Sequence, residues 1–148
     1  MATFYYQITS VSLSQFATLA DEFDPQGGYQ LNSEIRFGFN ASRNELTCTF
    51  SLVCQENGGA PVLKAEMICG FHIQEKSLAG LKKMDDIIFP VDFLGHLASL
   101  TYSSLRGAIH VKAEGTSFCR FVLPLQDVSA YITKPYIYHP EEGDQGPC

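Results

Sequence analysis

Three consecutive stretches of this chain alternate apolar and polar residues, and this pattern constrains the fold more than any other feature. Apolar residues recur at a period of two through 35–39, 46–54 and 63–73, and the residues between them are mostly polar. Successive side chains of a β-strand point to opposite faces of its sheet. The pattern therefore predicts an antiparallel sheet with one face in water and one face buried. The predicted buried face consists of Ile35, Phe37, Phe39, Leu46, Cys48, Phe50, Leu52, Cys54, Leu63, Ala65, Met67, Cys69, Phe71 and Ile73.

Turn residues and β-propensity place the remaining strands. Residues 4–13 are rich in aromatic and β-branched side chains, which favours an opening strand. Asn57-Gly58-Gly59 is a strong hairpin signal between two of the alternating stretches. The main strands are therefore expected near 4–13, 32–40, 44–56 and 61–75.

One clear amphipathic helix is predicted, over Pro90–Tyr102. Proline at a first-turn position is compatible with a helix start, and the apolar residues that follow Pro90 recur at the helical period. Gly107 is expected to end this region. The adjacent carboxylates Asp85 and Asp86 favour the positive end of the helix dipole. Less regular segments are interpreted as a helical turn or loop at 77–86, an added strand or hairpin within 106–123, and one or two helical turns at 125–132.

The predicted helix is too small for the predicted sheet. A helix of this length is about 18 Å long and about 10 Å wide. Four strands of about eight residues present a face of about 26 by 19 Å. About half of the apolar face would then need other cover, either from the hairpin within 106–123 folding over it or from another molecule. The hypothesis that follows is that this uncovered face binds a partner.

Length and charge narrow the function classes. The 148 residues suit one domain, expected at 1–135, followed by a disordered tail at 136–148. A net charge of −6, with no basic stripe, argues against nucleic acid as a partner. No signal-peptide pattern and no run of eighteen apolar residues is present, so we expect a cytoplasmic protein without membrane insertion.

The sequence contains no clear motif for catalysis or metal binding. The glycine pairs lack the flanking pattern and lysine of a phosphate-binding loop. Cys69 and His72 are spaced like zinc ligands, but on a strand they point to opposite faces. The five cysteines form no disulfide framework, and most fall on the apolar face as small hydrophobic residues. We therefore expect no catalytic residues, no metal, no cofactor and no enzyme activity.

Four short motifs, in order and spacing, resemble the SecB family of export chaperones and its SecB-like relatives. The third alternating stretch ends in Gly70-Phe71-His72-Ile73, and Ile88-Phe89-Pro90 begins the helix. Gly115-Thr116-Ser117-Phe118 and the segment from Leu123-Pro124 to Val128 are similar to later motifs of the family. The resemblance extends over residues 4–132.

This resemblance implies an α+β fold, with a four-stranded antiparallel sheet and the main helix packed on one face, assembled as a homodimer or homotetramer. It implies an ATP-independent holdase that binds unfolded or partly folded polypeptides in apolar grooves and serves protein export through the SecA motor. The residues that it implies for client binding or oligomer contacts are Phe37, Phe39, Phe50, Leu63, Ala65, Met67, Phe71, Phe89, Phe93 and Leu97.

Several positions depart from the family pattern. Val91-Asp92-Phe93 replaces the family's Tyr-Ala-Arg, residues 106–114 resemble an insertion, Pro135 shortens the second helix, and few acidic residues remain in the tail. One alternative is an adaptor or assembly module with a fixed partner, such as an antitoxin. A small-molecule-binding or enzymatic domain is another, and it would show one enclosed pocket with convergent polar groups.

Overall fold

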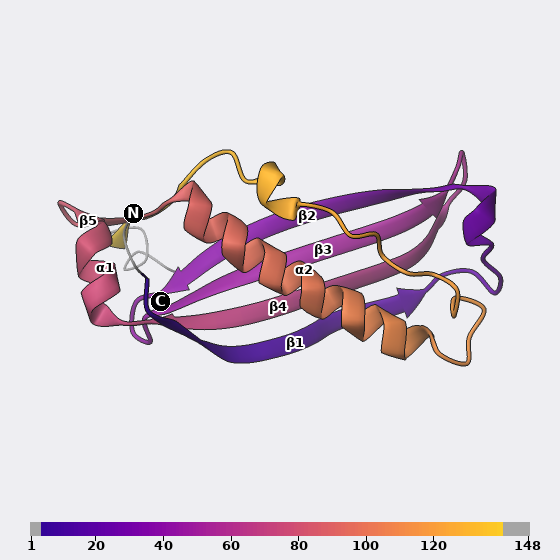
Figure 1. The fold of residues 1–148 in the computed structure, drawn as a ribbon, viewed down its shortest axis with the longest axis horizontal. Helices are drawn as coiled ribbons and strands as arrows, with labels where there is room; N and C mark the ends of the chain where they lie inside the picture. The colour runs from indigo at the N-terminus through magenta and orange to yellow at the C-terminus, as the bar shows by residue number, and fades with distance from the viewer. Residues whose placement is uncertain (1–3, 141–148) are drawn as a thin grey trace, which may run out of the picture.

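A four-stranded antiparallel sheet crossed on one face by a long helix forms the body of the protein (Figure 1). The computed structural model describes residues 4–140. The strands lie in the order β1-β4-β3-β2, so β1 and β2 are the edges. Their bounds are β1 (Tyr6–Thr18), β2 (Tyr29–Asn40), β3 (Glu45–Glu56) and β4 (Pro61–Ile73). The predicted α+β class and its four main strands are confirmed.

The two central strands show the predicted alternation of burial. Every second residue of β3 from Leu46 to Cys54 is buried, and the residues between them are half-buried. On β4, the residues opposite them across the register are buried as well. The hairpin between β3 and β4 turns at Gly58, whose φ of 70° suits glycine better than other residues. The sheet therefore has one dry face and one wet face, as its sequence predicts.

The main helix, α2 (Val91–Ala113), is longer than predicted. Its 23 residues give a length of about 35 Å, nearly twice the expected value. The prediction that it ends near Tyr102 is wrong because Gly107 lies within the helix, where glycine costs only about 1 kcal/mol relative to alanine. Leu105, Ile109 and Ala113 continue the buried side at intervals of four residues. Residues 108–113 are therefore helix, not strand.

A second, smaller sheet lies at one end of the main sheet (Figure 1). It contains β5 (Lys82–Lys83), β6 (Asp86–Phe89) and β7 (Tyr136–Tyr138), and helix α1 (Glu75–Leu81) precedes it. The disordered tail predicted at 136–148 therefore begins too early, since residues 136–138 pair with β6. The acidic residues Glu141, Glu142 and Asp144 lie outside the described residues.

Residues 114–135 form a segment that we call the strap. It returns from the end of α2 along the β2 side of that helix (Figure 1). The strand predicted at 118–123 is absent, and the turn predicted at 125–132 is the 3-10 helix η2 (Val128–Tyr131). Another 3-10 helix, η1 (Pro25–Gly27), lies between β1 and β2. Four strap residues are almost fully buried: Phe118, Phe121, Leu123 and Val128.

The long helix and the strap together cover the centre of the apolar face. The inner residues of β3 and β4 are at most 2% exposed within one protomer, apart from the ends of the strands. The estimate that half of this face stays uncovered is therefore wrong for the central strands. Any surplus of apolar surface must lie at the edges of the sheet.

Candidate functional site

The structure places most of the predicted client-binding residues in the core. Phe37 and Phe39, on the edge strand β2, are only partly buried. The other eight predicted residues belong to the hydrophobic core, and each is at most 5% exposed: Phe50, Leu63, Ala65, Met67, Phe71, Phe89, Phe93 and Leu97. The structure thus brings the predicted set together, but mainly as the interior of one protomer.

Two neighbouring apolar side chains are exposed on β1, which the sequence analysis did not single out. Ile8 and Val11 are opposite Phe71 and Cys69 of β4, on the same face as α2. They are 47% and 55% exposed, because α2 crosses the sheet diagonally and leaves much of the β1 edge uncovered (Figure 1). We call the inward-facing residues of this strand the β1 strip: Tyr6, Ile8, Val11, Leu13 and Phe16.

Two irregularities in register explain why this strip is hidden in the sequence. The pairing of β1 with β4 shifts between Ile8 and Ser10 and again between Leu13 and Gln15. Each shift inserts one extra residue, as in a β-bulge. The apolar residues of the strip are therefore spaced by two or three positions, and simple alternation does not find them.

A groove continues the β1 strip towards the start of α2. Its volume is about 460 Å³, and it is lined by Phe4, Tyr6, Leu81, Pro90, Asp92, Phe93 and His96. Phe4 stacks on Phe93 with ring centroids 4.4 Å apart. The hydroxyl of Tyr6 lies 2.6 Å from Nε2 of His96, which ties β1 to the helix. The groove is thus mainly apolar, with the Tyr6–His96 pair and Asp92 among its lining residues.

The open edge of β1 is interrupted by its two bulges but is not blocked by charge or proline. Natural edge strands are commonly blocked by charged residues or proline, yet Tyr6–Thr18 contains neither. The amide of Gln74 donates to the carbonyl of Tyr5. Because such bonds alternate along an antiparallel pair, the main-chain groups of Tyr6 and Ile8 point away from β4. The edge therefore offers main-chain hydrogen bonds beside exposed apolar side chains.

The opposite face of the sheet is polar. Glu66 accepts hydrogen bonds from Ser14 at 2.7 Å and Ser51 at 2.8 Å, and Arg36 donates to it at 3.0 Å. The hydroxyls of Ser14 and Ser51, followed by the charge of Arg36, hold the pKa of Glu66 below its usual value. This polar cluster suits a face of the sheet that is in contact with water.

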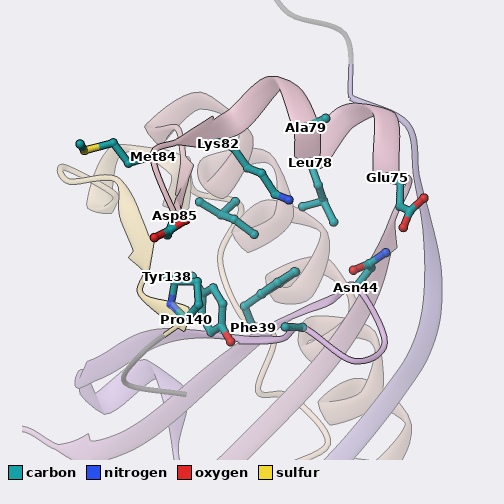
Figure 2. A pocket seen from close by; sticks show the side chains of 12 residues that line it. Phe39, Asn44, Glu75, Leu78, Ala79, Lys82, Met84, Asp85, Tyr138 and Pro140 are labelled. Carbon is teal, nitrogen blue, oxygen red and sulfur yellow. The ribbon is translucent and has the colours of Figure 1, made fainter. Parts of the chain in front are cut away.

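A larger hollow of about 570 Å³ lies between the end of the main sheet and α1 (Figure 2). Phe39, Leu78 and Tyr138 contribute apolar surface, and Lys82 and Glu75 contribute opposite charges. Figure 2 shows these side chains arriving from separate elements around an open space. The arrangement is mixed and open, unlike the enclosed pocket with convergent polar groups expected of a small-molecule site.

The buried thiols are poor candidates for reactive groups. Burial raises the pKa of Cys48 to about 12 and the pKa of Cys54 to about 11, so both remain protonated at neutral pH. Within residues 4–140, no three His, Cys, Asp or Glu side chains gather where they could hold a metal ion. In the same range, no helix is both long and apolar enough to cross a membrane.

Comparison with solved structures identifies a protein of the same architecture. The SecB-like chaperone Rv1957 of Mycobacterium tuberculosis, in complex with a ChAD peptide from the Rv1956 HigA1 antitoxin, superposes with a TM-score of 0.53. The alignment covers 82% of this chain and 90% of the other, at 16% sequence identity. The fold is SecB-like. No protein-family model matches the sequence, and no curated protein matches it either. At this identity the likeness concerns the SecB-like fold alone.

Proposed function

We propose that this protein is a SecB-like chaperone that binds non-native polypeptides without nucleotide and without catalysis. The observation that carries the proposal is the β1 strip, in which Ile8 and Val11 stay exposed beside an uncharged strand edge. An exposed apolar surface on a folded protein marks an interaction site or an aggregation hazard. An unfolded segment supplies both partners that this surface lacks, namely apolar side chains and free main-chain groups.

The predicted client-binding residues take two roles in this proposal. Phe50, Leu63 and Phe93, like the other buried members of the set, hold the sheet and α2 together and so keep the strip in place. Phe37 and Phe39 stay partly accessible on the other edge strand and offer adaptable aromatic contacts there. A client that reaches the buried members must first open the core.

The same surface supports self-association, so the proposal includes a cytoplasmic homodimer or homotetramer. Two open edges can extend one sheet into the next, and the charge-free β1 is better suited to this than β2, which carries Glu34 and Arg36. Delivery of clients to the SecA motor, and hence a role in protein export, is a further part of the proposal. It rests on the resemblance of the sequence to the export chaperones.

A second candidate is an adaptor dedicated to one partner, such as an antitoxin. The structural neighbour is a SecB-like chaperone bound to an antitoxin peptide, which favours this reading over an enzymatic one. Both candidates use a polypeptide-binding surface. They differ in selectivity, since a dedicated adaptor binds one segment and leaves unrelated unfolded proteins to aggregate.

Light scattering by a heat-denatured client, without nucleotide, tests the proposal. The full chain should suppress aggregation, and Val11→Asp should weaken suppression several-fold because it places a charge within the strip. Ile137→Asp is the matched control, since Ile137 is 42% exposed against 55% for Val11 but lies on β7 of the smaller sheet. A monomer that leaves every client's aggregation unchanged, or two variants with equal effects, contradicts the assignment.

A further inference from the structure

The strap has the character of an extended peptide lying on the protein. Between η2 and the turns that follow α2, it is not part of either sheet. Phe121 and Leu123 are buried, while Val122, between them, is 51% exposed and Leu125 is 83% exposed. This alternation is typical of an extended segment that has one side against a surface. Regular secondary structure does not hold it there.

An aromatic socket receives the first part of the strap. The ring of Phe118 stacks on Phe23 with centroids 5.2 Å apart, and Phe121 meets the same ring edge-on at 5.5 Å. Phe121 also contacts Tyr29 at 5.5 Å. Phe23 and Tyr29 belong to the connection between β1 and β2 and to the start of β2. The socket is therefore built by the body of the protein, and the strap only fills it.

Side chains of α2, not main-chain groups, hold the strap's backbone. Arg106 Nε donates to the carbonyl of Leu123 at 2.8 Å, and the hydroxyl of Tyr102 donates to the carbonyl of Pro124 at 2.6 Å. The two donors are four residues apart on the helix, so they lie on one side of it. Donors that bind carbonyl oxygens do not depend on the identity of the side chains in the bound segment. They can serve any extended chain.

The strap approaches α2 closely at one glycine. A Cβ atom placed on Gly95 would lie 2.9 Å from the Cβ atom of Ser129 in η2. Farther along the helix, a Cβ atom on Gly107 would meet nothing within 4 Å. Beside this contact, a hollow of about 300 Å³ remains between the strap and β2, lined by Ser33, Ile35, Tyr131 and Ile132. Gly95 thus permits the docked position of η2, and a gap lies next to it.

We propose that the strap occupies a second polypeptide-binding groove, and that an extended client segment displaces it. This inference rests on the proposed chaperone function. The fitting segment has an aromatic and an aliphatic side chain two positions apart, like Phe121 and Leu123. The strap is tethered at both ends, by α2 and by β7, so it competes as an intramolecular ligand. Clients therefore bind this groove only in the fraction of molecules whose strap is released.

Two changes at Gly95 test the proposal in opposite directions. One is a disulfide that holds the strap on α2, called the lock, and the other is an added methyl group that pushes the strap away, called the wedge. The lock is Gly95→Cys with Ser129→Cys, made in a full chain that also carries Cys119→Ser and Cys148→Ser. The 2.9 Å separation requires a small shift to reach the usual Cβ–Cβ distance of about 3.8 Å in disulfides. The wedge is Gly95→Ala, which must push η2 away from α2. Gly107→Ala is its control on the same helix.

The probe is a fluorescent synthetic peptide of residues 116–128, made with Cys119→Ser, and its binding is measured by anisotropy. The oxidised lock should bind this peptide about tenfold more weakly than the same protein after reduction. The wedge should bind it several-fold more tightly than wild type, and Gly107→Ala should match wild type. Thiol titration reports whether the lock has formed, and thermal melting shows that each variant is folded. If the disulfide does not form, the comparison of peptide binding by Gly95→Ala and Gly107→Ala tests the proposal.

Equal binding by the oxidised and reduced lock overturns the inference, as does a wedge that behaves like Gly107→Ala. So does a protein that binds no peptide in any form. In the first two cases, suppression of aggregation through the β1 strip still stands, because Val11→Asp tests it separately. A loss of suppression activity in all forms removes the proposed function as well.

Discussion

Replacing Leu97 with alanine tests whether the residues implied by the family resemblance act as core or as client contacts. Leu97, in the first half of α2, is fully buried in the hydrophobic core. Removing a buried leucine side chain costs its transfer free energy and leaves a cavity, together about 3–5 kcal/mol. For a chain of 148 residues, a loss of about 3 kcal/mol lowers Tm by about 6–12 °C. This is a large share of a total stability of about 5–15 kcal/mol.

The assay compares thermal melting with client binding for Leu97→Ala and Val11→Ala. Val11 is 55% exposed, so its truncation should change the unfolding free energy by no more than about 0.5 kcal/mol. Measured at 15 °C, where Leu97→Ala remains folded, client affinity should fall for Val11→Ala and stay near wild type for Leu97→Ala. A Leu97→Ala protein that melts like wild type but no longer binds client would refute the placement of Leu97 in the core.

Three further outcomes follow from the geometry. Folding lowers the pKa of Glu66, so its carboxylate stabilises the fold above the unfolded-state pKa of about 4.3, and this contribution is lost as pH falls through the lower folded-state pKa. Ser14→Ala should therefore reduce the fall of Tm at acid pH. An unchanged dependence of Tm on pH would count against the hydrogen bond from Ser14 to Glu66. In the native protein at pH 8, iodoacetamide should label the exposed Cys119 well before Cys48, whose pKa is raised to about 12 by burial, and equal labelling rates by mass spectrometry would show that the core opens readily. Gly107→Ala should stabilise the protein by about 0.5–1 kcal/mol in urea denaturation, because an alanine there gains helix propensity and meets no neighbour; a destabilised variant would mean that another molecule or segment packs on this side of α2.

The sequence alone determines the sheet at its centre, because the signal there is local. Leu46 to Cys54 and Leu63 to Ile73 alternate over whole strands, and both stretches have the partner that their pattern implies. Asn57-Gly58-Gly59 likewise encodes its own turn, since the positive φ at Gly58 is a property of that residue. The start of α2 after Pro90 is local for the same reason.

Tertiary structure decides where the chain exposes apolar surface. The bulges of β1 shift Ile8 and Val11 out of simple alternation, and their exposure depends on how far α2 reaches across the sheet. The apolar residues of 108–113 fit either a strand or a helix by pattern, and packing of Ile109 and Ala113 against the sheet selects the helix. Phe118 and Phe121 are buried only because Phe23, nearly a hundred residues earlier, provides a surface for them. Periodicity reports a residue's neighbours along the chain, whereas burial depends on residues that are distant in sequence and close only in the folded protein.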